Sequence, residues 1–207
     1  MNYFVTGTDT GVGKTFVSAL LIRALRDAGN DTVGLKPICC GDRDDAEVLR
    51  EAGGNELELD DVNPVWFRVP AAPYTASMVE NRLPDLDQIR DRFQRIRGQR
   101  RSLIVEGVGG WLVPICRDFS IADLAAEMGL PVLVVAANRL GALNHTLLTV
   151  EAIQARGLPC AGVILNNVEG TADPATTTNR AVLEHLLNVP LLHEIDRGQR
   201  SLDLRAC

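Results

Sequence analysis

The stretch GTDTGVGKT, residues 7–15, follows the apolar run YFV and carries the residue types of a phosphate-binding loop. The common form of such a loop is G-x-x-x-x-G-K-[ST]. Gly13, Lys14 and Thr15 match its end, but Thr8 stands where the first glycine belongs. Glycines let successive backbone N–H groups face one anion, the lysine reaches phosphate oxygens, and the threonine can bind Mg²⁺. The residues therefore predict a nucleotide site, with a plain surface turn as the alternative.

Carboxylates after other apolar runs are candidates to hold a cation beside that loop. Glu106 ends the run LIVE, and Asp45 lies in GDRDDA together with Asp42 and Asp44. Carboxylate oxygens are ligands that Mg²⁺ prefers. For Glu106 the alternative is a strand end that points into solvent, and for Asp45 it is the N-cap of the following helix. The glycine loop VGGW that follows Glu106 favours the cation role for that residue, whereas for Asp45 the spacing alone favours neither interpretation.

A second lysine, Lys36, ends the run TVGLK just before Pro37. Buried parallel strands are almost continuously apolar, so we expect this lysine to emerge at the carboxyl edge of the sheet, near the phosphate loop. Taken alone, Lys36 is better explained as a surface lysine whose aliphatic stem lies along apolar neighbours.

Short apolar runs alternate with helical patterns along the chain, which predicts the order of its elements. We expect strands at 2–6, 31–37, 101–107, 130–137, 159–167 and 190–195, and helices at 14–29, 44–52, 86–98, 120–127, 142–156 and 175–187. Residues 53–84 are rich in proline and weakly periodic, so we expect a loop with one turn of helix near 75–80. This order predicts an α/β fold with a mostly parallel sheet, covered by helices on both faces, in a single domain over 1–207.

Composition narrows the class of protein. The 207 residues carry a formal net charge of −6, which disfavours a general nucleic-acid or anionic-membrane binder. The five cysteines form no C-x-x-C, which argues against a disulfide framework or a zinc site and favours a reducing cytosol. The first residues lack a signal-peptide pattern, and no apolar stretch reaches the ~18 residues of a membrane span. We expect a cytoplasmic protein without nucleic-acid or membrane partners.

Taken together, the motifs resemble those of the dethiobiotin synthetase family. The matching stretches occur in the family's order and cover most of the chain: YFVTGTDTGVGKT (3–15), GLKPICCG (34–41), VEGVGGW (105–111), RLGALNH (139–145) and AGVILNN (161–167). The early glycine of GTDT-x-VGKT belongs to this family's own loop, and few other phosphate-loop enzymes share LGALNH. The resemblance implies a P-loop NTPase fold and a homodimeric, Mg²⁺-dependent cyclo-ligase. Such an enzyme converts 7,8-diaminononanoate, CO₂ and ATP to dethiobiotin, ADP and phosphate through a carbamate and a carbamic–phosphoric anhydride.

The resemblance also implies roles for individual residues. Those matching the nucleotide site are Thr10, Gly11, Val12, Gly13, Lys14, Thr15, Asp45, Glu106, Gly107, Val108, Gly109, Asn166 and Asn167. Those matching Mg²⁺-associated residues are Thr15, Asp45 and Glu106, and those matching catalytic residues are Lys36, Lys14 and Thr10. Those matching substrate contacts are Cys40, Gly141, Ala142, Leu143 and Asn144. The last four lie at a helix N-terminus, which the family uses across its dimer to bind the substrate carboxylate, as free N–H groups there bind anions.

Two positions depart from the family, and other functions compete. Cys40 replaces a small hydroxyl residue, and HEID (193–196) replaces G-x-I-P near the adenine.

One rival is a nucleotide-switch ATPase of the partitioning or septum-placement type, although such proteins carry an early loop lysine where this chain has Asp9. A cobyrinate-type amide synthase would need a glutaminase domain. A third rival is a nucleotide-binding module that has lost its activity.

Overall fold

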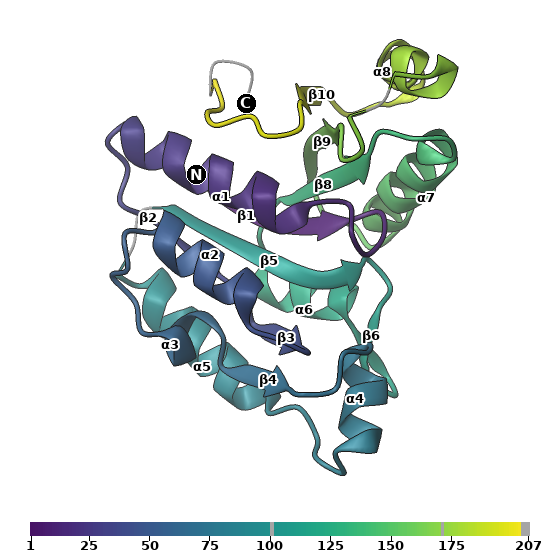
Figure 1. Ribbon diagram of the computed structural model, residues 1–207. Helices are drawn as coiled ribbons and strands as arrows, with labels where there is room; N and C mark the ends of the chain where they lie inside the picture. The colour runs from purple at the N-terminus through teal and green to yellow at the C-terminus, as the bar shows by residue number, and fades with distance from the viewer. Residues whose placement is uncertain (100–101, 171, 204–207) are drawn as a thin grey trace.

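The computed structural model describes residues 1–99, 102–170 and 172–203, and a six-stranded sheet forms its centre (Figure 1). In sheet order the strands are β10 (Leu191–Ile195), β9 (Cys160–Asn166), β8 (Val132–Ala137), β1 (Asn2–Gly7), β5 (Ser102–Gly110) and β2 (Thr32–Leu35). Every neighbouring pair is parallel. The predicted α/β fold with a parallel sheet is confirmed.

Helices cover both faces of this sheet (Figure 1). One face packs against α1 (Lys14–Asp27) and α2 (Asp44–Ala52), and the other against α5 (Leu86–Arg97), α6 (Ile121–Met128) and α7 (Ala142–Ala155). Helix α8 (Pro174–Leu186) lies beside α7 and β10. Successive strand residues point to opposite faces, so Phe4 joins the core under α5–α7 while Val5 joins the core under α1 and α2.

The strand order reverses at β1. The chain passes from β1 through α1 to the edge strand β2, returns to β5 between them, and then crosses to β8, β9 and β10 on the other side. Connections that leave in opposite directions open a crevice outside the carboxyl ends of the strands, which is where such sheets bind ligands. The loop after β1 lies at this reversal.

The segment 53–84 is more ordered than predicted. It contains α3 (Leu59–Val62), β4 (Val65–Phe67) and α4 (Pro73–Val79). Strand β4 pairs in parallel with β3 (Ile38–Cys40), which follows β2 closely in the chain. The loop prediction is wrong for these residues because a three-residue strand is too short to show a period. The turn of helix expected near 75–80 is confirmed by α4.

Other boundaries differ in detail. Strand β5 runs on to Gly110, beyond the predicted end at 107, because Gly110 still pairs with Gly7. An antiparallel pair, β6 (Pro114–Cys116) and β7 (Phe119–Ser120), precedes α6 and was not predicted. Arg101, predicted to begin β5, and Cys207 lie outside the described residues. Among the helices of the described ranges, none is long and apolar enough to cross a membrane.

The contact of α1 and α2 with β2 leads to a stability prediction. A Cβ on Gly34 would lie 2.6 Å from Ile22 Cδ1 and 2.9 Å from Leu49 Cβ. We expect Gly34→Ala to lower the free energy of unfolding by about 1–3 kcal/mol, the usual cost of overpacking a filled core, as measured by urea denaturation. Gly98→Ala is the control, because a Cβ there meets no atom closer than 3.5 Å. Equal stability of the two variants would contradict the prediction.

Candidate active site

The loop between β1 and α1 has the backbone geometry of an anion-binding loop. Gly11 and Gly13 have φ angles of 74° and 85°, which residues with side chains rarely adopt. Gly13 is also the N-cap of α1, so the first N–H groups of that helix, which lack acceptors inside the helix, lie directly after the glycines. This geometry fits the predicted phosphate site.

The structure also explains why the first glycine stands at position 7. A Cβ on Gly7 would lie 2.7 Å from Asp9 O, 2.8 Å from Val12 Cγ2 and 3.1 Å from Lys14 Nζ. The same oxygen of Asp9 accepts a hydrogen bond from Lys14 Nζ at 3.3 Å. The loop folds back over Gly7, and a side chain there would push both Lys14 and the Asp9 carbonyl away.

Beside this loop, Lys36 stands at the centre of a cluster of charges in which Lys36 and Glu106 are buried and Asp45 is half exposed. Its Nζ donates to Asp45 Oδ2 at 2.7 Å and to Glu106 Oε1 at 2.6 Å. The hydroxyl oxygen of Thr15 lies 2.7 Å from Asp45 Oδ1 and 2.8 Å from Glu106 Oε1. The residue after β2, a residue of β5, and the first turns of α1 and α2 thus bring an ammonium, two carboxylates and a hydroxyl together.

Burial decides the alternatives that the sequence left open. Lys36 is 2% exposed and Glu106 is fully buried, so the surface interpretations of both residues are wrong. The N-cap of α2 is Arg43, and Asp45 lies inside the first turn of the helix, so Asp45 is not the N-cap. Asp42 and Asp44 are exposed.

The two lysines differ in their protonation. Burial acts to lower the pKa of Lys36, but the attraction of Glu106 and Asp45 outweighs it and raises the pKa above its usual value. Burial likewise opposes ionisation of Asp45, yet Lys36 holds the pKa of that carboxyl below its usual value. For Lys14, burial followed by repulsion from Lys36 lowers the pKa to about 8. A permanently charged lysine therefore lies near one that titrates close to neutrality.

The oxygen atoms of the cluster fit a small divalent cation. Glu106 Oε2 is buried and has no hydrogen-bond partner. The Thr15 hydroxyl, which has one proton to donate, faces two carboxylate oxygens. Hard oxygen ligands of this kind suit Mg²⁺, which usually takes its remaining ligands from water and phosphate. Within the described ranges no group of three or more His, Cys, Asp or Glu side chains is arranged to hold a metal ion, so a cation here would have two carboxylates and a hydroxyl as its protein ligands.

A cavity of about 700 Å³ opens on this cluster. Its lining comes from the phosphate loop, the cluster, β3, β5 and two loops: Thr10, Gly11, Gly13, Lys14, Thr15, Lys36, Cys40, Asp45, Pro70, Ala71, Ala72, Val108, Gly109 and Val113. Sequence reasoning missed Pro70–Ala72 and Val113, because they lie in aperiodic segments with no chemical signal. Cys40, a predicted substrate contact, lines the cavity, and burial raises the pKa of its thiol to about 11.

Not every predicted residue reaches this cavity. A Cβ on Gly107 would lie 3.0 Å from Ile121 Cγ2, so this glycine allows close packing of α6 on β5. Residues 141–144 begin α7, and within the described chain they do not line the cavity of Lys36. The N–H of Ala142 already donates to Arg139 O at 3.0 Å. Within one chain the predicted substrate contacts therefore lie in two separate places, with Cys40 at the Lys36 cavity and residues 141–144 away from it.

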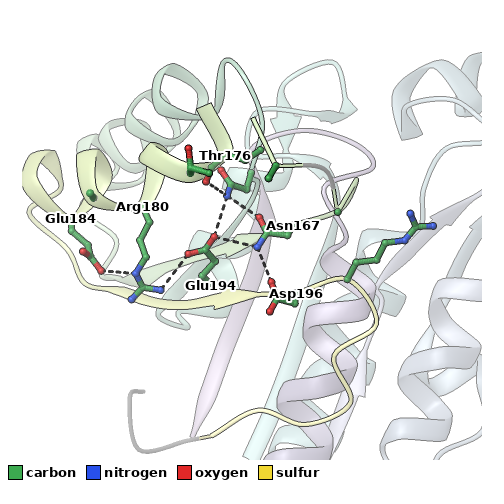
Figure 2. A pocket seen from close by; sticks show the side chains of 12 residues that line it. Asn167, Thr176, Arg180, Glu184, Glu194 and Asp196 are labelled. Atoms are coloured by element: carbon green, nitrogen blue, oxygen red, sulfur yellow. Dashed lines mark hydrogen bonds and ion pairs between the residues drawn. The ribbon is translucent and has the colours of Figure 1, made fainter. Parts of the chain in front are cut away.

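Asn166 and Asn167 lie on the opposite side of the phosphate loop. Asn166 Nδ2 donates to Val12 O at 2.9 Å, which joins the end of β9 to the loop. Asn167 lines a second cavity, of about 600 Å³, beneath α8 (Figure 2). Its Nδ2 donates to Glu194 Oε1 at 3.2 Å and to Asp196 Oδ1 at 3.1 Å, as the dashed lines in Figure 2 show. The HEID segment therefore gives this side of the loop a polar, acidic wall.

Comparisons with known proteins find relatives along nearly the whole chain. A profile of the family described as AAA domain matches residues 1–200. The ATP-dependent dethiobiotin synthetase BioD of Akkermansia muciniphila is 47% identical over 203 residues, which cover 98% of this chain and 95% of the relative. The proteins of the same name from Anaeromyxobacter dehalogenans strain 2CP-C and Bacillus subtilis strain 168 are 46% and 36% identical. They match 96% and 92% of this chain and 94% and 84% of the relatives.

Solved structures with the same fold are more distant in sequence. The ParA family ATPase of Chlorobium tepidum has a TM-score of 0.57 and 11% identity, with 96% of this chain and 85% of that chain covered. The MinD cell division protein of Aquifex aeolicus has a TM-score of 0.57 and 17% identity, with coverage of 94% and 81%. These similarities show a shared P-loop NTPase fold.

The lowered pKa of Lys14 predicts proton uptake when a nucleotide binds. With a pKa of about 8, roughly half of the Lys14 side chains are neutral at pH 8, and phosphate oxygens favour the charged form. We expect ATP binding to take up about half a proton at pH 8 and almost none at about pH 6.5, where Lys14 is already charged. Calorimetry in buffers of different ionisation heat measures the uptake.

Lys14→Arg is the matched control, because a guanidinium stays charged across this range. Its binding reaction should lack the uptake at pH 8. If the wild type and Lys14→Arg take up equal numbers of protons, another group is responsible.

Proposed function

The chain belongs to the family of ATP-dependent dethiobiotin synthetases, and we propose that it joins CO₂ to the two amino groups of 7,8-diaminononanoate at the cost of ATP. The observation that supports this most is the charge cluster beside the phosphate loop, in which the buried Lys36 pairs with the buried Glu106 and with the half-exposed Asp45. Closing a cyclic urea in this reaction requires phosphoryl transfer to a carbamate. The phosphate loop, the carboxylate of Asp45 and the buried ammonium of Lys36 line one cavity of about 700 Å³, and Glu106 pairs with Lys36. Together they supply what that step needs.

The first half of the reaction brings two negative groups together. An unprotonated amine of the substrate takes up CO₂, releases a proton and becomes a carbamate. A carbamate oxygen then attacks the γ-phosphorus of ATP, ADP leaves, and a carbamic–phosphoric anhydride forms. Lys14 and Lys36 offset the repulsion between carbamate and γ-phosphate, since both ammonium groups are buried at the wall of the same cavity.

The second half needs no protein nucleophile. The other amine attacks the carbonyl carbon of the anhydride, phosphate leaves, the nitrogen loses a proton and the ring closes. Cys40 keeps its proton because its pKa is raised to about 11, so its thiol contributes a wall and a weak hydrogen bond. Thr10 lines the cavity and would contact the reacting groups from the loop. Catalysis rests on positioning and charge.

Magnesium is the cation that Thr15, Asp45 and Glu106 would hold. Bound there, it supplies neutralisation of phosphate charge. The unpartnered Oε2 of Glu106 supports this assignment, because a buried carboxylate oxygen without a donor is costly unless a cation satisfies it.

The nucleoside end of ATP would lie toward Asn166 and Asn167. The cluster of Lys36 and Glu106 marks the terminal-phosphate end on the β5–β2 side of the loop, so the base extends toward β9 and β10.

We place this activity in one cytoplasmic domain over 1–207. The six-stranded sheet, whose two faces are covered by helices of the same chain, supports one domain.

A homodimer would complete the substrate site. Residues 141–144 lie apart from the Lys36 cavity of their own chain, and exposed leucines lie near them. Leu140 precedes them in the chain, and Leu148, one turn further along α7 than Asn144, lines a surface cavity together with Leu112. Leu112, Leu140 and Leu148 are 62%, 85% and 57% exposed. Apolar side chains that gather on a surface in this way mark an interaction site. Across such an interface, N–H groups at the start of α7 would bind the substrate carboxylate of the partner.

The rival functions have less support. The switch ATPases among the solved structures share the fold at 11–17% identity, whereas the named synthetases are 36–47% identical over nearly the whole chain. A module without activity would be recognised by its failure to form product.

The reaction itself is the first test. We expect phosphate release from ATP to require both 7,8-diaminononanoate and bicarbonate, with dethiobiotin, detected by mass, formed one for one with phosphate. Lys36→Met should lower kcat by about 100-fold or more, because the charge that favours attack on the γ-phosphate is lost. Arg90→Met, a change in a surface arginine that pairs with Asp87 and Glu127, is the control and should retain kcat. Phosphate release that ignores the diamine, without dethiobiotin, would refute the proposal.

Mixing two inactive variants tests the shared site. Lys36→Met removes the ammonium, and Asn144→Asp places a carboxylate where the substrate carboxylate would bind. If α7 serves the partner's cavity, a mixed dimer holds one intact site and one doubly defective site. After exchange of equal amounts, about a quarter of wild-type activity should return, because half of the dimers are mixed. No recovery in a mixture shown to exchange would place both residues in one chain's site.

A further inference from the structure

Asn63 is a buried amide whose hydrogen bonds go to the segments around the Lys36 cluster. It lies between α3 and β4 and is 1% exposed. Its Nδ2 donates to Lys36 O at 2.8 Å and to Val65 O at 3.0 Å, and its Oδ1 accepts from Arg43 Nε at 2.9 Å. Both amide protons and the oxygen are engaged, which fixes the orientation of the group.

The first of these contacts holds the backbone of Lys36. The ladder between β2 and β5 ends at Leu35, so the main sheet does not hold the Lys36 peptide. Instead, the N–H of Lys36 donates to Val62 O at 2.9 Å, and its carbonyl accepts from Asn63. Pro37 follows and has no N–H to add. The direction in which the Lys36 side chain leaves the sheet is therefore set by Val62 and Asn63.

The second contact holds the start of α2. Arg43 is the N-cap of this helix, and its carbonyl accepts from the N–H of Glu47 at 3.0 Å. Its guanidinium donates not only to Asn63 Oδ1 but also, through Nη2, to Asn63 O at 2.8 Å and Leu59 O at 3.2 Å. Asp45 lies two residues after Arg43, in the first turn, so its place depends on where α2 begins.

We propose that Asn63, acting with Arg43, is a positioning residue that sets Lys36 and Asp45 relative to each other for the reaction. The inference rests on the proposed function and adds two residues that the family resemblance does not assign. The 2.7 Å contact between Lys36 Nζ and Asp45 Oδ2 joins two separate connections of the chain. Asn63 contacts both connections. A shift of about 1 Å in either connection is enough to lower the rate by a large factor.

The role of Asn63 can be separated from a purely structural one. In the described chain none of its side-chain hydrogen bonds reaches the phosphate loop, and Lys14 bonds only within that loop. Loss of a positioning residue should therefore lower kcat while ATP still binds. Loss of a merely structural residue would reduce the amount of folded protein and leave kcat per folded molecule unchanged.

Two substitutions of Asn63 test whether kcat per folded molecule falls while ATP binding is retained. Asn63→Ala removes all three bonds, whereas Asn63→Asp keeps an acceptor for Arg43 but cannot donate to Lys36 O. We expect both to lower kcat by about 10–100-fold per folded molecule, with the Kd for ATP changed by less than about 3-fold in calorimetry. Asn30→Ala is the control, since it removes an amide that donates to Leu25 O at 3.0 Å, at the far end of α1, and it should keep kcat.

A double variant asks whether Asn63 acts through Lys36. Added to Lys36→Met, Asn63→Ala should cost less than about 3-fold further, because the group that it positions is already absent. Losses that multiply would overturn the inference.

If the Asn63 variants do not fold, Arg43→Met provides a second route, because the Arg43 side chain is 20% exposed whereas Asn63 is 1% exposed. It should lower kcat by about 3–10-fold with the Kd for ATP retained, and an unchanged kcat would overturn the inference. A wild type that forms no dethiobiotin would refute the proposed function itself. An active wild type with unchanged kcat in folded Asn63 variants would refute the positioning role alone.

Discussion

The contact on which the rest of the structure depends is the buried ion pair between Lys36 Nζ and Glu106 Oε1, 2.6 Å apart and almost completely out of solvent. Burying either charge alone is strongly unfavourable, and removing one partner of such a pair commonly costs about 3–5 kcal/mol. The pair is possible because β2 and β5 are neighbours in register, with Leu35 opposite Val105, so that the next residues of both strands meet. The sheet order thus creates the charge cluster, and the cluster in turn favours that sheet order.

Around this pair, each functional group comes from a different element. The phosphate loop and α1 bring Lys14 and Thr15, α2 brings Asp45, and the ordered segment after it brings Asn63. Lys14 and Lys36 lie close enough that their mutual repulsion, after burial, contributes to the low pKa of Lys14. The pKa of Lys36 is raised instead of lowered, because two carboxylates face its ammonium group. The wall of one cavity therefore holds Lys36, which stays charged, and Lys14, whose charged form a bound anion would favour.

The parts that could be predicted from the sequence are those with a local signal. The strands and helices of the main sheet have apolar periods that identify them, and α2 was located to its exact ends, Asp44–Ala52. The prediction for residues 53–84 was wrong because β4 has three residues and α3 has four, too few to show a period. Asn63 and Pro70–Ala72 were missed for the same reason, since nothing in their neighbourhood marks an asparagine or a proline as part of a site.

By itself, the sequence determined the phosphate loop, the alternation of strands and helices, and the family, because these depend on residue types at short and regular spacing. Tertiary structure alone decided that Lys36 and Glu106 are buried together and that Asn63 holds the backbone of Lys36. It also showed that Asp45, which the resemblance had named, contacts Lys36, whereas Asp42 and Asp44 are exposed. These contacts join residues as far apart as 70 positions, as in the pair of Lys36 and Glu106. Such contacts follow from which strands become neighbours and where each loop ends, and no short window of sequence contains that information.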